Sequence, residues 1–510
     1  MDELTNDPIN EGMDETFTEP ISDNTAEIPV DAAQDAPADE NRPVNPRRRK
    51  KTKLQIFKET QLPLIILAVT AVLLLIFIFG SIGRAVNKFK AERDASIAAS
   101  ESIAQRDAAY AAEVERLLKT AEQQAAGYDY LGAIATIDSF SGDIAAYEQL
   151  MTKRAEYQEL QRSVQEWSNP NDVTNLSFHP LIADPSVAFA NNIYGGTDGS
   201  YNENFITVNE FSAILEQLYA NGYMLVELED FIGTTKGADG SITYEAQSVY
   251  LPAGKKPLMI TQTHCNYYNY MADSDEDGEI DAGGSGFASK LIIGADGKLA
   301  NEMIAADGST VTGAYDLVPI LEAFIEAHPD FSYGGARATL AFTGYDGLFG
   351  YRTSALNKEN MEEADYNAEL QAATTVLSAL RSKGYHLACN TYQNRAYGEM
   401  DNDSIQEDLN AWANEVTPLL GSVDTLVYAS DSDILDDTGA YSSDTYELLK
   451  AAGFKYFIGF CDSGSRWVHV GGDYVRQGRI MVTGYNLNAN STWFSGMFDT
   501  ATVIDSARPE

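Results

Sequence analysis

The stretch KPLMITQTHCNYYNYM, residues 256–271, is the part of the chain on which the fold assignment depends most. Its first half is a short apolar run, of the kind that forms a strand buried on both faces. A histidine, a cysteine and five tyrosine or asparagine side chains follow at once. Polar and aromatic side chains that come directly after a buried strand are typical of a site at the edge of a parallel sheet. We therefore predict a strand here, with functional side chains after it.

The same alternation of strand and helix continues on both sides of this stretch. We predict helices at 207–220, 317–327, 367–383 and 445–452, and strands at 338–344, 384–391, 424–430, 454–460 and 479–485. Alternation over more than two hundred residues favours a parallel sheet or barrel whose site lies at the carboxyl ends of its strands. The chemistry is then expected just after each of these strands.

The amino-terminal part of the chain has a different composition. Residues 1–60 form an acidic segment with few aromatic residues that ends in the basic run RRRKKTK at 47–53, and we predict that this tail is disordered. Residues 61–83 follow as an uncharged apolar run that is long enough to cross a bilayer once. Because Arg47 to Lys53 and Lys58 outweigh Arg84, Lys88, Lys90 and Arg93, the tail is expected in the cytoplasm and the rest outside.

Residues 84–169 are predicted to form a helical stalk, because Ala, Glu, Gln and Lys dominate and apolar residues repeat at the spacing of one helix face. A Gly-Tyr-Asp-Tyr turn at 127–130 divides two helical segments in the manner of a single tetratricopeptide-like hairpin. One such unit is a spacer rather than a peptide receptor. Residues 170–510 then make the outer domain.

Charge and cysteine content exclude some classes of function. The formal net charge of −41 repels phosphate backbones, so nucleic acid is not expected as a partner, whereas metal cations and basic partners are favoured. Three cysteines, Cys265, Cys389 and Cys461, are too few and too scattered for a disulfide framework. We expect them to be small buried residues, with one disulfide left open as an alternative.

The segments FITVNEFSAILEQLYANGYMLVELEDF, KKPLMITQTHCNYYNYM, GARATLAFTGYDGLFGYRTSA, LRSKGYHLACNTYQN and GDYVRQGRIMVTGYNL resemble, in this order, the polysaccharide deacetylases of the NodB-homology class. The resemblance covers residues 178–510 and is nearest to membrane-anchored members. It implies an α/β fold, a distorted (β/α) barrel of polysaccharide-deacetylase type, preceded here by the helical stalk and one transmembrane helix. It also implies a bacterial cell-envelope protein that acts on acetylated glycan.

The positions that carry catalysis and metal binding in that family are altered in this sequence. The resemblance places Thr263 and His264 where the family has two adjacent aspartates, and Asn390 and Asn394 where it has two histidines. Threonine cannot act as the carboxylate base, and amide oxygens replace imidazoles poorly around a transition metal. LVYASDSD at 426–433 also stands where an arginine-and-proline motif is expected. We therefore expect no transition metal and no retained catalytic residue.

Two other cation sites can be weighed from the sequence. A zinc set of His264, Cys265, Cys389 and His386 would need a strand irregularity, because strand alternation turns both cysteines away from the face of His264 and Asn390. Downstream, an acidic loop matches most positions of a calcium loop but has Gly284 where a bidentate glutamate belongs, so we expect weak calcium binding or a solvated turn. Its ligands would be Asp273, Asp275, Asp277, Glu279 and Asp281.

Aromatic and amide side chains near the strand ends are expected to contact a glycan. They are Asn266, Tyr267, Tyr268, Tyr345, Tyr392, Gln393 and Trp493. The sequence thus predicts a membrane-anchored, deacetylase-like pseudoenzyme that binds cell-wall polysaccharide or peptidoglycan. Two alternatives stay open: an active metal-dependent deacetylase with rearranged ligands, and a structural or signalling anchor that binds a protein, through its barrel or its cytoplasmic tail.

Overall fold

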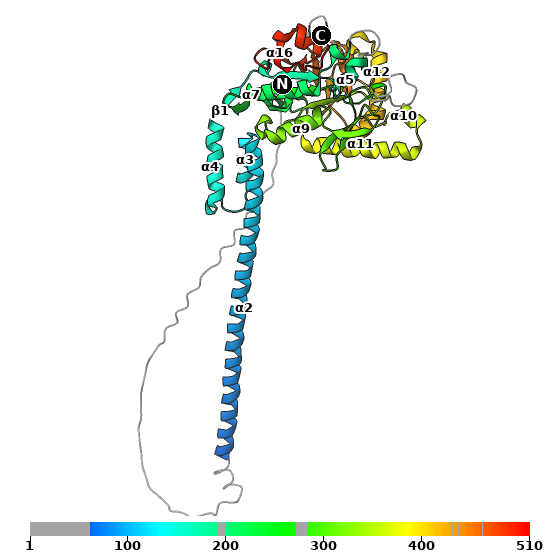
Figure 1. Cartoon of the computed structure of the whole chain (residues 1–510). Helices are drawn as coiled ribbons and strands as arrows, with labels where there is room; N and C mark the ends of the chain where they lie inside the picture. The colour runs from blue at the N-terminus through cyan, green and yellow to red at the C-terminus, as the bar shows by residue number, and fades with distance from the viewer. Residues whose placement is uncertain are drawn as a thin grey trace, which may run out of the picture. The chain divides into compact units, whose positions relative to one another are not determined.

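The computed structural model describes residues 62–191, 200–271, 284–430, 432–436, 439–461 and 463–509. The chain divides into two compact units, 1–99 and 100–510. The fifteen α-helices of the described residues are α2 Leu62–Ala126, α3 Tyr130–Asp138, α4 Glu148–Arg162, α5 Pro185–Asn191, α6 Tyr201–Asn204, α7 Val208–Ala220, α8 Leu228–Phe231, α9 Leu317–Ala327, α10 Ala355–Asn360, α11 Glu363–Lys383, α12 Asn402–Ala411, α13 Thr417–Leu420, α14 Asp444–Ala451, α15 Gly484–Ala489 and α16 Thr500–Val503 (Figure 1).

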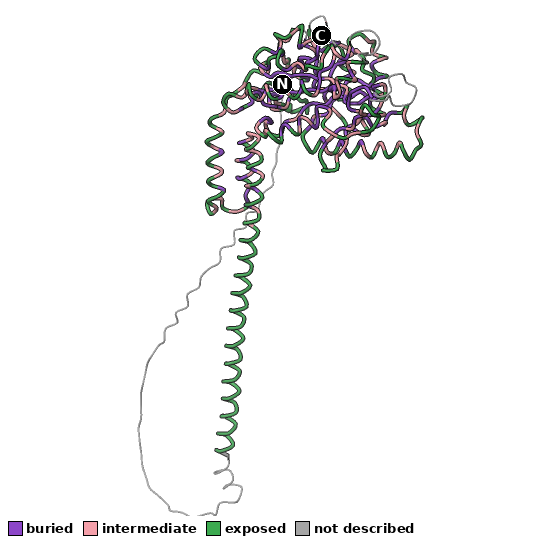
Figure 2. Tube along the Cα trace, in the orientation of Figure 1, coloured by how far each residue is buried: buried purple, intermediate pink, exposed green. Residues whose placement is uncertain are grey.

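Helix α2 contains the apolar segment of the first unit. The large apolar side chains from Leu64 to Phe79 are exposed along this helix, which Figure 2 shows as a continuous exposed stretch. By length and composition, Leu64–Ala126 includes a stretch that could cross a membrane. Exposed leucine, isoleucine and phenylalanine side chains in such number are unfavourable in water and favourable in lipid.

The predicted helical hairpin forms at the end of α2 and buries its own small core. Val114 and Leu117 of α2 pack with Ala133 and Ile137 of α3 and with Tyr157 of α4. The sequence pattern predicted that the helix beginning at residue 148 continues to about residue 167. In the structure this helix, α4, ends at Arg162. Residues 164–167 instead form the strand β1, which pairs antiparallel with β6. The prediction was wrong there because this edge pairing, which is non-local, overrides local helix propensity.

Seven parallel strands close into a barrel in the second unit. In order around the barrel they are β7 Lys256–Gln262, β11 Thr339–Phe342, β12 His386–Cys389, β13 Thr425–Val427, β14 Tyr456–Phe460, β16 Val475–Met481 and β2 Thr174–Phe178. The barrel closes because β7 pairs with β2 on one side and with β11 on the other. The sequence prediction of an α/β barrel is thereby confirmed, with a helical segment and one long apolar helix before it.

The other strands lie outside this ring. They are β1 Val164–Trp167, β3 Tyr223–Leu225, β4 Ile232–Lys236, β5 Ile242–Ala246, β6 Val249–Pro252, β8 Ala288–Ile293, β9 Leu299–Ile304, β10 Thr310–Gly313 and β15 Val468–Val470. Strand β3 adds to β7, and β15 pairs antiparallel with β16. Strands β8, β9 and β10 form a separate antiparallel sheet.

Side chains of the barrel strands alternate between two cores. Ala341, Ala388, Val427 and Ile458 form a small apolar layer of their own. Their neighbours along the strands, such as Leu340 and Leu387, belong to the main core between barrel and helices. Because successive side chains of a strand face opposite ways, the small layer lies inside the barrel. The interior is therefore narrow and packed, and ligands are expected at the ends of the strands.

The short helix α8 carries a carboxyl group whose titration is a test of the fold. Burial raises the pKa of Asp230 to about 6, and the carboxylates of Glu229 and Asp129 add to the effect. Asp230 also accepts a hydrogen bond of 2.7 Å from the backbone N–H of Glu227. Because the folded protein holds this proton more tightly than the unfolded chain does, stability is gained as pH falls through 6 and lost as pH rises.

We expect Asp230→Asn to stabilise the protein at pH 7.5 by about 1–2 kcal/mol, because asparagine keeps an oxygen acceptor but carries no charge to desolvate. The advantage over the native protein should shrink to about half at pH 5, where the native carboxyl is already protonated when folded. Urea denaturation at pH 7.5 and at pH 5 measures the difference in the free energy of unfolding between the variant and the native protein. If Asp230→Asn stabilises the protein equally at both pH values, the pKa of Asp230 is not raised.

Candidate functional site

The carboxyl ends of the barrel strands, with the residues that directly follow them, are called here the barrel mouth. Thr263 and His264 follow β7, and His179 follows β2, which pairs with β7. Oγ1 of Thr263 lies 3.0 Å from Nδ1 of His179. Thr263, which the resemblance places at a catalytic-base position, is 1% exposed and contacts the histidine that follows the neighbouring strand.

His264 leaves the strand in the left-handed region, with φ of 58°. Its ring centroid lies 5.2 Å from that of His179. Nδ1 of His264 lies 3.2 Å from the hydroxyl oxygen of Tyr268, which in turn lies 2.7 Å from Oγ1 of Thr343 after β11. A chain of polar side chains thus links the ends of three neighbouring strands.

Arg479 of β16 adds a buried positive charge to this end of the barrel. Its side chain donates 2.9 Å to the carbonyl oxygen of Ile458, within β14, and 2.8 Å to that of Tyr428, directly after β13. The residue is only 2% exposed. A guanidinium with its planar set of donors is suited to bridge two neighbouring strands in this way.

The electrostatics of the barrel mouth keep both histidines neutral. Burial, followed by the positive charge of Arg479, lowers the pKa of His264 to about 4. Burial, His264 and Arg479 together lower the pKa of His179 well below 6.5. Both shifts have the sign expected for imidazoles that are desolvated beside a cation.

These residues do not fit a catalytic divalent metal ion. A hydrolytic site needs about three good ligands and an open position. Among the described residues, no group of three or more His, Cys, Asp or Glu side chains could hold a metal. The barrel mouth offers two imidazoles beside the Arg479 guanidinium, whose charge repels a dication. We derive no reaction step through a metal here.

Asn390 and Asn394 lie after β12, where the resemblance places two histidines. Asn390 is 1% exposed, and its Nδ2 donates 2.9 Å to the carbonyl oxygen of Val427. Its Oδ1 is buried and has no hydrogen-bond partner among the described residues. Asn394 is exposed with φ of 55°. One of the two amides is therefore used to join β12 to β13, and the other lies at the surface.

Strand alternation holds for β12 but not through His264. Ala388 and Asn390 share the inner face, and Cys389 belongs to the outer core, as predicted. On the other strand, Thr263 faces His179, whereas the side chain of Gln262 bonds Asp316 outside the barrel. The prediction that strand alternation continues as far as His264 and Cys265 was wrong, because β7 ends at Gln262 and His264 turns into the left-handed region.

The cysteines are buried and unpaired, as the sequence favoured. Cys265 and Cys389 are part of the main core, and burial raises the pKa of both thiols well above 9. A buried neutral thiol is a poor metal ligand, because the ligand form is the thiolate. The arrangement gives no support to a zinc set of His264, Cys265, Cys389 and His386.

Several of the predicted glycan contacts have their polar atoms engaged inside the protein. The Asn266 amide donates 2.7 Å to the carbonyl oxygen of Thr343 and accepts 3.0 Å from its N–H, which fixes the loop after β11. The Tyr267 hydroxyl donates 2.5 Å to Asp316. Tyr268 is stacked between Tyr270 and Tyr345, at 5.4 and 5.1 Å between ring centroids. Of this group, Tyr270 and Tyr345 are the half-buried rings.

Tyr392 and Gln393 line a pocket of about 360 Å³ that we call the β12 pocket. The remaining lining residues are Arg395, Met400, Ser404, Glu407, Asp408 and Ala411. Asp408 is buried and accepts hydrogen bonds from the backbone N–H groups of Tyr392 (2.7 Å) and Gln393 (3.1 Å), so it shapes the loop. Gln393, Arg395 and Glu407 are exposed. Trp493, elsewhere, is half-buried and packs against Gly464.

The predicted calcium loop falls on a part of the chain that the structure does not describe. Asp273, Asp275, Asp277, Glu279 and Asp281 all lie within residues 272–283, outside the described residues. Gly284, the position that lacks the bidentate glutamate, is described and has φ of 58°. Weak calcium binding stays a prediction.

Sequence reasoning missed His179 and Arg479. The short segment TNLSF of β2 was not predicted as a strand, so the histidine after it had no place near β7. Arg479 was read as the start of an apolar strand, although it lies deep within β16 (Val475–Met481). An arginine within an apolar strand was the signal that could have pointed to Arg479, whereas the mixed polar and apolar residues before His179 gave no such signal.

Comparison with known proteins adds little to this geometry. No protein-family model matches the chain, and no curated protein matches it. Among solved structures, the Streptococcus pyogenes deacetylase PplD in complex with acetate is similar, with 11% sequence identity and a TM-score of 0.30. The alignment covers 63% of this chain and 96% of that one. A likeness at this level carries no argument, and the fold assignment rests on the strand pairing itself.

Proposed function

We propose that this protein is a single-pass, membrane-anchored protein of the bacterial cell envelope. Its outer barrel is of the NodB-type polysaccharide-deacetylase class, has lost metal-dependent hydrolysis, and binds a cell-wall glycan such as peptidoglycan. The sequence resemblance supports the class, and the closed seven-stranded α/β barrel agrees with the fold that the resemblance implies.

The chemistry of the barrel mouth is the observation that carries the proposal. Where a deacetylase of this class needs a carboxylate base and metal ligands, this chain has Thr263 bonded to His179 and Asn390 bonded to Val427. The guanidinium of Arg479 supplies a permanent charge of the wrong sign for a cation site. The loss involves several strands at once, so no single side chain restores the reaction.

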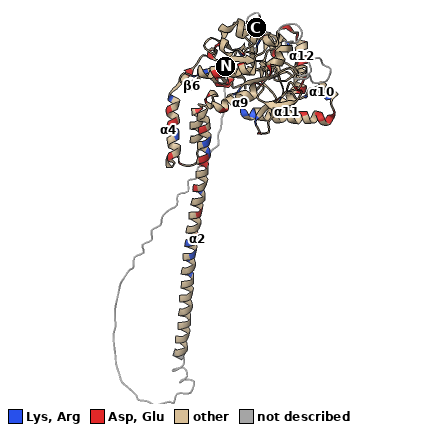
Figure 3. Cartoon of the chain, viewed as in Figure 1, with Lys and Arg blue, Asp and Glu red and all other residues tan. Residues whose placement is uncertain are grey.

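The membrane arrangement follows from charge on the two sides of the apolar segment. Figure 3 shows α2 as largely free of charged residues along its apolar part, with charged residues further along. The basic run at 47–53 precedes this segment in the sequence. By the positive-inside rule, we place the amino terminus in the cytoplasm and the barrel outside.

The β12 pocket is where we place a sugar. Its exposed groups include an amide (Gln393), a guanidinium (Arg395) and a carboxylate (Glu407), which together offer both donors and acceptors. A sugar hydroxyl needs both, and the apolar side chains of Met400 and Ala411 can face ring C–H groups. The pocket follows β12, on the side of the barrel where this class of fold binds ligands.

Binding to purified peptidoglycan and to chitin oligomers tests the proposal. We expect the full-length protein in nanodiscs to bind at least one of them, and Gln393→Ala/Arg395→Ala to weaken that binding about tenfold or more. Gln371→Ala/Lys358→Ala is the matched control, because it removes one amide and one cation from the exposed surface of α11 and α10. It should change binding less than twofold.

Other outcomes would favour the alternative functions. Acetate release from either glycan that a chelator abolishes would show an active deacetylase and contradict the loss of hydrolysis. Absence of binding to either glycan would contradict this assignment and favour an anchor that acts through protein partners.

A further inference from the structure

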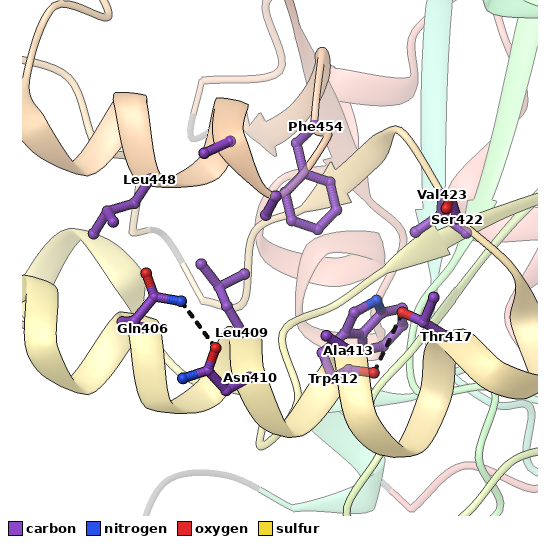
Figure 4. Close-up of a pocket in the computed structure, with 12 residues that line it drawn as sticks. Gln406, Leu409, Asn410, Trp412, Ala413, Thr417, Ser422, Val423, Leu448 and Phe454 are labelled. Atoms are coloured by element: carbon purple, nitrogen blue, oxygen red, sulfur yellow. Dashed lines mark hydrogen bonds between the residues drawn. The ribbon is translucent and has the colours of Figure 1, made fainter.

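A second set of cavities lies on the outer wall of the barrel, away from the barrel mouth. The first is a cavity of about 300 Å³ between α12, the π-helix Trp412–Val416 and α14 (Figure 4). Its lining residues are Gln406, Leu409, Asn410, Trp412, Ala413, Thr417, Ser422, Val423, Leu448, Ala451, Ala452 and Phe454. A π-helix is rare and is frequent at functional sites.

The lining of this first cavity is uncharged. None of its twelve residues is ionisable, although residues 171–510 contain 48 acidic and 17 basic residues. Gln406 Nε2 donates 3.1 Å to Asn410 Oδ1, as the dashed line in Figure 4 shows. The second polar atoms of these two amides, Gln406 Oε1 and Asn410 Nδ2, add an acceptor and a donor to the lining. This is the pair that complements one backbone amide of an extended peptide.

The second cavity, of about 520 Å³, continues the first. The two share Ser422, Val423 and Ala452 as lining residues. We call the combined feature the outer trough. It reaches the amino ends of three barrel strands, because its lining includes His386 at the start of β12 and Asp424 and Lys455 directly before β13 and β14. An elongated trough suits an extended chain better than a single sugar ring.

The second cavity is locally rich in positive charge. Lys455 lies 3.8 Å from Asp424, which is also 3.8 Å from His386. Arg381 also lines the cavity and donates a hydrogen bond to the carbonyl oxygen of Leu420, and this bond neutralises no carboxylate. Two permanent cations therefore face one carboxylate in a domain that is otherwise strongly acidic. A carboxylate is the ligand group that this imbalance favours.

We propose that the outer trough binds an extended peptide segment of a partner protein. An aliphatic side chain occupies the uncharged cavity, the peptide backbone pairs with Gln406 and Asn410, and an Asp, a Glu or a terminal carboxylate lies between Arg381 and Lys455. The aromatic rings of the floor disfavour a sugar, because Trp412 is 5% and Phe454 2% exposed and neither offers a face for stacking. The inference is independent of glycan binding at the β12 pocket.

Peptide selection tests this inference. A phage-displayed library of random dodecapeptides is selected on full-length protein in nanodiscs, and the selected peptides are synthesised for fluorescence polarisation. We expect an aliphatic residue followed within a few positions by a carboxylate. Ala452→Tyr, which fills the junction of the two cavities, should abolish binding. Lys455→Glu should weaken it at least tenfold, whereas Lys450→Glu should change it less than twofold.

Lys450 is the matched control because it undergoes the same charge reversal on the neighbouring helix but does not line the trough. Selected peptides without an acidic residue, or peptides whose binding Ala452→Tyr leaves intact, would overturn the inference. So would an effect of Lys450→Glu as large as that of Lys455→Glu. Loss of chitin or peptidoglycan binding in Ala452→Tyr would assign the trough to glycan instead, and loss of self-association in that variant would assign it to a second copy of this chain.

Discussion

Replacing Arg508 with alanine is expected to destabilise the barrel domain by about 3–5 kcal/mol, the cost of breaking a buried ion pair. The Arg508 guanidinium lies 2.7 Å from Oε2 and 2.5 Å from Oε1 of Glu210, and both side chains are 5% exposed or less. It also donates 2.8 Å to Oδ1 of Asn202 and 2.7 Å to the carbonyl oxygen of Phe205. Through these contacts Arg508 holds the carboxyl-terminal residues against α6 and the start of α7.

Urea denaturation of the full-length protein in nanodiscs measures this effect. The double variant Glu210→Gln/Arg508→Ala should lose less than the two single variants combined, because it leaves no unpaired buried charge. Lys236→Ala, at an exposed position of β4, is the control and should stay within about 0.5 kcal/mol of the native protein. A loss below 1 kcal/mol for Arg508→Ala would show that the carboxyl-terminal segment is not fastened in this way.

Replacing Arg479 with methionine is expected to have two effects. It removes the donors to the carbonyl oxygens of Ile458 and Tyr428, which should cost about 3–6 kcal/mol of stability, since hydrogen bonds to charged groups contribute about 1.5–3 kcal/mol each. It also removes a positive charge beside His264, so the pKa of that imidazole should rise above its value of about 4.

An NMR titration of the histidine ring protons in detergent micelles measures the second effect. Arg479→Lys is the matched variant, because lysine keeps the positive charge but lacks the planar set of N–H donors of the guanidinium. It should lower stability as well but leave the His264 pKa low. An unchanged His264 pKa in Arg479→Met would mean that the guanidinium does not set the potential at the barrel mouth.

The strands that could be predicted from sequence are those whose buried residues are mostly apolar. Strand β7 was clear because Leu258, Met259 and Ile260 are consecutive apolar residues, as parallel strands require. Strand β2 was missed because Thr174, Asn175 and Ser177 are buried polar residues, and Asn175 bonds Gln477 and Thr261 within the barrel. Burial of paired polar groups leaves no apolar pattern to read.

Of the candidate site, only the residues that directly follow a recognisable apolar strand could be predicted from the sequence. Thr263 and Asn390 lie at the barrel mouth because each follows a recognisable apolar strand. His179 and Arg479 come from positions distant in sequence, and only the pairing of β2 with β7 and β16 brings them there. Likewise, no local pattern showed that Asn266 would be used to hold the backbone of Thr343.

The metal content of the purified full-length protein tests the central claim most directly. The protein is dialysed with and without zinc, cobalt and nickel, and the metal retained per chain is measured by mass spectrometry. We predict far less than one transition-metal ion per chain, because the Arg479 charge and the two neutral imidazoles do not make a catalytic site. About one tightly retained ion per chain, lost on substituting His264, would contradict the account and identify the barrel mouth as a metal centre.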